Sequence, residues 1–197
     1  PRFDAAYLLV SNGRATFVDT GHNAAVPRLL QALEQLGLGR DAVDWVIPTH
    51  VHLDHAGGLG LLVSQLPQAQ VLSHPRGARH LIDPSALLAG ARAVYGEATV
   101  AATYGELVPV PAERVVHSTD DMVLDWAGRP LRLIDSPGHA RHHHAVWDAR
   151  SRGWFTGDTF GIAYPEFHGP RGPFLFVSST PVQFEPDAMR ASLQRML

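Results

Sequence analysis

The segment His50-Val51-His52-Leu53-Asp54-His55 places three imidazoles and one carboxylate within six residues, directly after an apolar run. Side chains two apart in an extended segment point to the same side, so His50 and His52 face one point. Asp54 and His55, further along the same turn, are free to face a second point. Imidazole nitrogens and carboxylate oxygens suit zinc, iron or manganese. A histidine-rich surface loop is the alternative, since the chain has 12 histidines, but histidines clustered with carboxylates indicate a metal or catalytic site.

The composition is that of a globular chain without a basic footprint. The 197 residues are 45% hydrophobic and 18% charged, which is enough chain to bury a large core. The net charge of −3 argues against nucleic acid as a partner. Without cysteine there is neither a disulfide nor a thiolate ligand. We expect a cytoplasmic protein with a small-molecule substrate and no membrane partner, and we allow for a homodimer.

Hydrophobic periodicity predicts two sheets with helices outside them, a layered α+β or α/β sandwich. Asn12-Gly13 is a hairpin signal between the first two strands, and Asn23 is expected to cap a helix that Gly37 ends. The expected strands are 5–10, 15–18, 43–47, 69–73, 115–116, 122–125, 131–134, 144–147 and 154–156, and further helices are expected at 57–65 and 186–197. The Ala-rich stretch 75–111 predicts an inserted helical cap. With no repeat or linker, we expect one domain, 1–197.

Two more candidates follow predicted strands, as the segment His50 to His55 does. His139 stands in Ser136-Pro137-Gly138-His139, and Asp158 stands in Thr156-Gly157-Asp158-Thr159. A lone histidine is more often structural and a lone aspartate more often a turn residue. Their shared placement at strand ends, where ligands gather in layered folds, makes them candidates for the same site.

The ordered set His50-X-His52-X-Asp54-His55, His139 and Asp158 resembles the metallo-β-lactamase superfamily, and Val18-Asp19-Thr20-Gly21 and Gly57-Gly58 extend the resemblance over nearly the whole chain. The resemblance implies a four-layer αββα sandwich with a two-metal site at one edge. It implies that His50, His52 and His139 bind the first metal, that Asp54 and His55 bind the second, and that Asp158 bridges both. Asp19 would orient a ligating histidine, the alternative being a turn carboxylate ahead of Gly21.

The carboxyl end departs from the family pattern. A final histidine beyond the last long helix usually completes the second metal, and this chain stops at Leu197. We expect truncation at both ends, since the chain also begins without a methionine; the alternative is an incomplete second site. His168 is the only histidine after Asp158, and its Gly/Pro-rich surroundings favour a substrate loop over a substitute ligand.

Several other side chains have weaker assignments. His143 matches a position where the family often has histidine and is expected near the site, while His142 and His144 are expected to be solvated. His22 is expected on the surface of a loop, although an approach to the metals is the alternative. We expect surface or packing roles for His74, His80 and His117. Region 86–104 should shape the pocket. We expect an apolar part of the substrate to contact Phe160, Tyr164 and Phe167, although packing in the core would explain these aromatic residues equally well. His168 is expected in the same substrate loop.

These features predict a metal-dependent hydrolase with two divalent ions. Zinc is the default, and iron or manganese accept the same ligands. A water shared by two cations loses its proton near neutral pH and attacks a carbonyl or phosphoryl centre, with Asp54 as the catalytic residue that orients it and passes its proton to the leaving group. The resemblance favours an ester, thioester or lactone, and the bridging aspartate argues against a true β-lactamase. A mononuclear iron oxygenase like the persulfide dioxygenases, or a non-catalytic metal-binding or signalling protein, is the alternative.

Overall fold

The computed structural model describes residues 5–197, which begin with a β hairpin. Strands β1 (Tyr7–Ser11) and β2 (Arg14–Val18) pair antiparallel. Asn12 and Gly13 both have positive φ, 47° and 74°, which is the conformation that a two-residue type I′ turn requires. The hairpin predicted at Asn12-Gly13 is confirmed.

The hairpin opens the first sheet, in which β2 and the three following strands run parallel. Its order is β1-β2-β3-β4-β5, with β3 (Val43–Ile47), β4 (Gln70–Ser73) and β5 (Val115–His117). The connections hold α1 (Val26–Gln35), α2 (Leu53–Ala56), α3 (Leu59–Ser64) and α4 (Pro75–Ile82). Because the strands are parallel, the segments that leave their carboxyl ends meet at one edge of the sheet.

The second sheet is antiparallel, with the order β6-β7-β8-β9. Its strands are β6 (Met122–Leu124), β7 (Leu131–Asp135), β8 (His144–Asp148) and β9 (Gly153–Phe155). A two-stranded sheet of β10 (Ile162–Ala163) and β11 (Leu175–Phe176) follows, and the chain closes with α7 (Pro186–Met196). The strands of the second sheet and α7 agree with the predicted pattern to within a few residues at their ends, whereas the β10–β11 sheet was not predicted.

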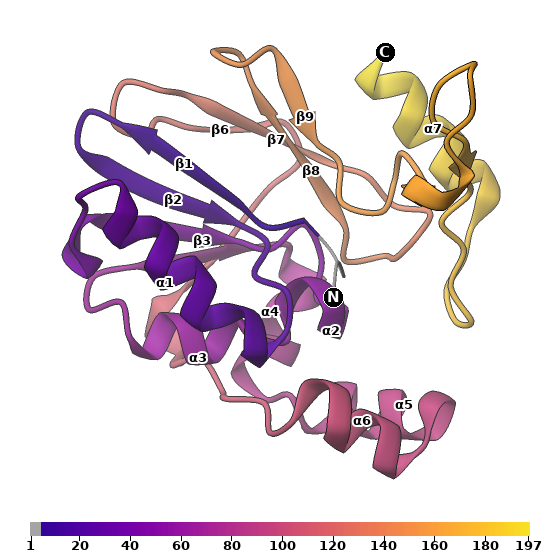
Figure 1. The fold of residues 1–197 in the computed structure, drawn as a ribbon, viewed down its shortest axis with the longest axis horizontal. Helices are drawn as coiled ribbons and strands as arrows, with labels where there is room; N and C mark the ends of the chain where they lie inside the picture. Colours follow the sequence, from indigo (N-terminus) through magenta and orange to yellow (C-terminus); the bar gives the residue numbers. More distant parts are fainter. Residues whose placement is uncertain (1–4) are drawn as a thin grey trace.

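The buried side chains define four layers. Alternate residues of β2 and β3 point to opposite faces: Phe17 and Val46 pack with α1 and α3, whereas Val18 and Ile47 pack against the second sheet. The outer face of the second sheet is covered by α7, whose Met196 packs with residues of β7 and β8. Figure 1 shows this order of helices, sheet, sheet and helix. The predicted αββα sandwich is confirmed.

Two helices, α5 (Ser85–Tyr95) and α6 (Glu97–Tyr104), stand out from the body as a hairpin (Figure 1). No residue of α5 is buried, and Val100 is the buried residue of α6. Asn23 does not cap α1, so that prediction was wrong. Its side-chain amide instead donates to the carbonyl oxygens of Tyr104 at 3.2 Å and Glu106 at 2.7 Å, which ties the end of the hairpin to the body. The assignment of 75–111 as an inserted cap stays a prediction.

Across residues 5–197, we find no helix with the length and apolar character that crossing a bilayer demands.

Candidate metal centre

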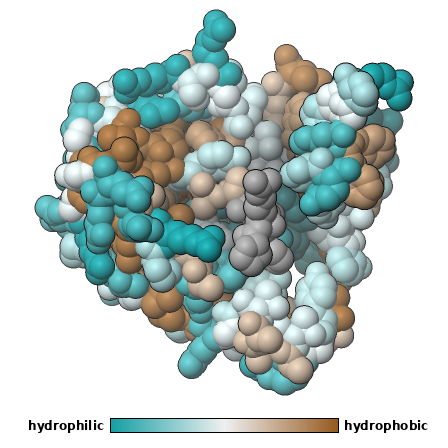
Figure 2. All heavy atoms as spheres, viewed as in Figure 1, coloured by the Kyte–Doolittle hydropathy of each residue, from teal (hydrophilic) through white to brown (hydrophobic). Residues whose placement is uncertain are grey.

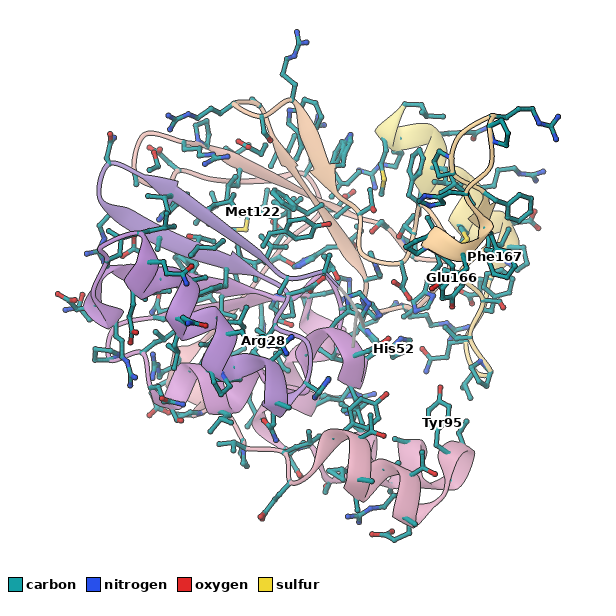
Figure 3. The ribbon with its side chains drawn as sticks, viewed as in Figure 1. Arg28, His52, Tyr95, Met122, Glu166 and Phe167 are labelled. Atoms are coloured by element: carbon teal, nitrogen blue, oxygen red, sulfur yellow. The ribbon has the colours of Figure 1, made fainter. Side chains whose placement is uncertain are left out.

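The candidate side chains come from three loops at one edge of the sandwich. His50, His52 and His55 lie between β3 and the end of α2, His139 lies between β7 and β8, and Asp158 follows β9. His52 immediately precedes α2 and has an extended backbone, with φ −62° and ψ 149°. The helix therefore begins only after His52. Figure 3 places His52 beside α2, at the opening between the α5–α6 hairpin and the lobe that carries Glu166 and Phe167.

Three imidazoles converge in a first cluster, formed by His50, His52 and His139. Nδ1 of His52 lies 3.0 Å from Nε2 of His50 and 2.9 Å from Nε2 of His139. Nitrogens bound to one tetrahedral zinc at about 2.0–2.1 Å stand about 3.3 Å apart. Both distances are therefore within a few tenths of an ångström of what a single ion requires, and all three atoms lie within 4.8 Å of one another.

Hydrogen bonds on the outer side of two rings leave lone pairs facing this point. Nδ1 of His139 donates to the carbonyl oxygen of Ser178 at 3.0 Å, and Nδ1 of His50 lies 3.2 Å from the hydroxyl of Thr49. Burial, followed by the neighbouring imidazoles, lowers the pKa of His50 far below its usual value and that of His52 to about 3. Both rings are thus neutral at pH 7, which is the form that coordinates a metal.

A second cluster is formed by His50, His55 and Asp158. Oδ1 of Asp158 lies 3.1 Å from Nε2 of His55, and Oδ2 lies 3.4 Å from Nε2 of His139. The two oxygens of one carboxylate therefore face the two clusters, one each. Burial opposes the charges here, yet Asp19 and Asp158 hold the pKa of His55 above its usual value, and His55 holds that of Asp158 below its own.

Asp19 positions His55 from behind. The carboxylate is buried, and its Oδ2 accepts from Nδ1 of His55 at 2.9 Å. The backbone N–H of Thr49 donates to it at 2.6 Å, and the Thr49 hydroxyl donates at 2.9–3.0 Å. Asp19 itself has φ 56°, a left-handed conformation that aspartate tolerates better than most residues. The arrangement fits the orienting role expected of Asp19.

Asp54 stands at the open side of the second cluster. Its Oδ2 is 4.0 Å from Nε2 of His55, and its side chain is 31% exposed, against 5% for His55. Asp54 lines the cleft in front of the centre, so it is the carboxylate that a bound molecule would meet.

The donor set fits divalent metal ions. Nε2 of His55 is a buried nitrogen that makes no well-directed hydrogen bond within residues 5–197, and Oδ1 of Asp158, 3.1 Å away, is itself a candidate ligand. Buried polar atoms are nearly always paired, so an atom left over among converging nitrogens and carboxylate oxygens indicates a ligand. Nitrogen and oxygen donors of this kind suit zinc, iron and manganese.

The run His142 to His144 divides among different roles. His143 is fully buried, accepts from the backbone N–H of Asp158 at 3.2 Å and contacts the hydroxyl of Ser136 at 2.7 Å, near the site as expected. The expectation that His144 is solvated was wrong: it is buried between the Ser118 hydroxyl at 2.9 Å and the carbonyl oxygen of Pro48 at 2.8 Å. His142 is only half-buried and lines the cleft.

The other histidines lie outside both clusters. His22 is half-buried, with its ring 6.4 Å from that of Tyr104. His74 is buried and caps α4 by accepting from the backbone N–H of Arg76 at 3.1 Å. His80 is half-buried at the cleft, and His117 is exposed at the end of β5.

A cleft of about 930 Å³ opens in front of the centre and is lined by His52, Asp54, His139 and Asp158 together with residues of α4, α5 and the loop 178–183. Figure 2 shows the molecule hollowed between the α5–α6 hairpin and the lobe beyond it. The lining residues of 86–104 agree with the expected role of that region. The four proposed substrate contacts do not line this cleft: Phe160, Tyr164, Phe167 and His168.

Two aromatic members of that set, Tyr164 and Phe167, belong instead to an exposed cluster beside the β10–β11 sheet. Tyr164 and Phe167 pack edge-on against each other and against Phe176, with ring centroids 5.3–6.2 Å apart. Both are about half exposed, at 47% and 59%. This arrangement gives no support to their contact with a molecule in the cleft. Thr49 and Ser178, by contrast, are site residues that the sequence did not single out.

Comparison with known proteins points to one family. A sequence profile described as the metallo-beta-lactamase superfamily matches residues 1–196. The metallo-beta-lactamase fold-containing protein ST1585 of Sulfurisphaera tokodaii is 31% identical over 161 residues, covering 80% of this chain and 57% of that protein. The hydroxyacylglutathione hydrolase of Aeromonas hydrophila is 28% identical over 198 aligned residues, covering 100% of this chain and 58% of that enzyme.

The fold agrees with this match. The solved structure of the archaeal superfamily protein ST1585 from Sulfolobus tokodaii superposes with a TM-score of 0.78 at 25% identity, covering 98% of this chain and 69% of that one. The chain spans less than two thirds of the length of the two curated relatives. The fold implies divalent metal binding, and the histidine-rich clusters lie where the three loops meet. This chain belongs to the metallo-β-lactamase superfamily.

Proposed function

We propose that the protein is a metal-dependent hydrolase that cleaves an ester, thioester or lactone carbonyl with a hydroxide held between two metal ions. The observation that carries the proposal is the placement of Asp158, whose two oxygens face His55 at 3.1 Å and His139 at 3.4 Å. A carboxylate in this position suits a bridge between two ions. The similarity to a hydroxyacylglutathione hydrolase supports a carbonyl as the target.

The residues divide the work between them. His50, His52 and His139 would hold one ion, while His55 and Asp54 would hold the other and Asp158 would bridge both. When bound, two divalent ions, zinc by default, would supply Lewis-acid chemistry that activates water near neutral pH and polarises the substrate oxygen. Asp54, exposed toward the cleft, orients the attacking oxygen and passes its proton to the leaving group.

The proposal also rests on the nucleophiles that the chain lacks. The sequence holds no cysteine and no Gly-X-Ser-X-Gly motif, the two commonest signatures of a covalent acyl intermediate. Activated water is the nucleophile that the residues at this centre can position.

Metal analysis combined with a substrate panel tests the proposal. We expect about two ions per chain and turnover of at least one ester, thioester or lactone. Asp158→Ala should lose bound metal and hydrolysis together, whereas Asp187→Ala, a matched change at a 95% exposed side chain of α7, should retain both. Two tightly bound ions in Asp158→Ala would contradict the bridge.

The same measurements separate the rival functions. One iron per chain with oxygen consumption would indicate an oxygenase that uses the first cluster alone. Bound metal without turnover across the panel would indicate a metal-binding or signalling protein on this fold.

A further inference from the structure

The cleft has two chemically different walls. α4 contributes Arg76 and Arg79 to its lining, three residues apart and therefore on one face of the helix. The α5–α6 hairpin contributes apolar and aromatic side chains: Leu87, Val94, Tyr95 and Tyr104. Figure 3 shows Tyr95 pointing from the hairpin into the opening. A cationic wall and an apolar wall thus border the same space.

The protein does not neutralise these two arginines. Arg141, the third arginine of the cleft, is paired with Glu185 at 2.6 Å. The ion pairs formed within residues 5–197 include neither Arg76 nor Arg79. The only lining carboxylates of the described cleft, Asp54 and Asp158, belong to the metal centre. Negative charge therefore lies at the centre, and unpaired positive charge lies on the wall.

One histidine contacts this wall, and another contacts the centre. Nε of Arg79 donates to Nε2 of His80 at 3.2 Å, which uses one of the five N–H groups of the guanidinium. The ring of His142 lies 5.3 Å from that of His52, measured between centroids. His80 and His142 both line the cleft. Arg79 and the proposed metal ligand His52 therefore border the same cleft, each beside one of these histidines.

We propose that Arg76 and Arg79 bind an anionic group of the substrate. The substrate would be an ester or thioester with a carboxylate, sulfonate or phosphate on one side of the scissile bond. Its other side would be an apolar portion that packs against α5. The inference rests on the proposed hydrolase function and names its substrate class. Guanidinium groups bind such oxyanions through paired hydrogen bonds. A neutral analogue would leave the two guanidinium groups without a counter-charge.

A pair of thioesters that differ only in charge tests this substrate class. The probes are the S-octanoyl thioesters of 3-mercaptopropionate and of the uncharged 3-mercaptopropionamide. In R76Q/R79Q we expect KM for the anionic thioester to rise about tenfold, since two partly exposed ion pairs are lost, with kcat and the neutral thioester little changed. The matched control R28Q/R150Q removes two exposed arginines that do not line the cleft. An equal change for both thioesters would overturn the inference.

A binding measurement separates this inference from the proposed function. Calorimetry on the metal-loaded protein compares octanesulfonate, whose head group is a weak metal ligand, with octanol. We expect wild type to bind octanesulfonate about tenfold more tightly than R76Q/R79Q does, with octanol unaffected. Equal affinities for octanesulfonate would overturn the anion site whether or not any ester is cleaved. A clear difference, with no ester cleaved, would uphold the anion site and reject the hydrolase.

Discussion

Two buried polar groups, one in the second sheet and one at the metal centre, behave in opposite ways. Asp148, at the end of β8 remote from the metal centre, is fully buried and accepts four hydrogen bonds: two from Arg129, at 3.0 and 2.5 Å, and two from the backbone N–H groups of Arg150 and Ser151, both at 3.1 Å. At the metal centre, Nε2 of His55 is also buried but makes no well-directed hydrogen bond within the described chain, and the oxygen 3.1 Å from it belongs to another candidate ligand, Asp158.

This difference in hydrogen bonding distinguishes a group that supports the fold from a group that is available to bind a ligand. A buried charge that its own chain hydrogen-bonds completely needs no further ligand, and loss of its partner destabilises the fold. At the metal centre, ring nitrogens that face away from the centre are hydrogen-bonded, whereas the ring nitrogens that converge on it lack such partners outside the centre. Buried polar atoms without partners indicate a ligand site. Changes in the first group should therefore affect stability, and changes in the second should affect metal binding and turnover.

The largest effect is expected from His139→Ala. It removes one of three converging nitrogens, so kcat/KM should fall by more than about a hundredfold, beyond the 10- to 100-fold that loss of an outer partner causes. Metal content should fall with it, as measured by plasma mass spectrometry. His117→Ala, at the exposed end of β5, is the control. A variant that retains metal and activity would remove His139 from the centre.

Asp148→Asn should show the opposite pattern. It leaves Arg129 beside a neutral amide, and breaking a largely buried pair costs about 2–4 kcal/mol of unfolding free energy. The loss is measured by urea denaturation, while metal content and kcat/KM of the folded protein stay unchanged. The control Asp187→Asn breaks an exposed pair with Arg190 and should cost less than about 1 kcal/mol. A loss of metal in Asp148→Asn would erase the contrast between the two groups.

Asp19→Asn and Ser178→Ala compare two residues that hydrogen-bond to candidate metal ligands. The amide keeps the shape of the carboxylate but weakens the hydrogen bond that orients His55, so metal affinity should fall about 10- to 100-fold. Ser178→Ala should cost less, because the carbonyl oxygen that accepts from His139 belongs to the backbone and stays. Competition with a chromophoric chelator measures both. An equal loss in the two variants would show that Asp19 has no special role.

Much of the architecture follows from local pattern. The Asn12-Gly13 hairpin and the strands β3, β7 and β8 were predictable because turn chemistry and hydrophobic runs are local properties. The gathering of the His50–His55 segment with His139 and Asp158 was predictable because all three follow strands, and the resemblance to a known family supplied their order.

Other contacts depend on partners that are distant in the sequence. His144 is buried because Ser118 and Pro48 lie across from it, which nothing in the run His142 to His144 indicates. Asn23 resembles a helix cap, yet its partners, Tyr104 and Glu106, are more than eighty residues away. The aromatic residues after Asp158 were expected at a pocket, but sequence cannot show which side of a loop they occupy.

The smallest expected effect is the dependence of the free energy of unfolding on pH in the acidic range. Hydrogen bonds from Arg129 hold the pKa of Asp148 well below its usual value, so its contribution to stability is complete above the unfolded pKa of about 3.9 and declines as the pH falls toward the folded value. In chelator-treated protein, the difference in unfolding free energy between wild type and Asp148→Asn should stay constant from pH 7 to 5. It should narrow by about 1 kcal/mol at pH 3. Because both proteins keep every titrating group of the metal centre, their difference isolates Asp148, and a gap that did not narrow would mean that the hydrogen bonds from Arg129 do not stabilise its charged form.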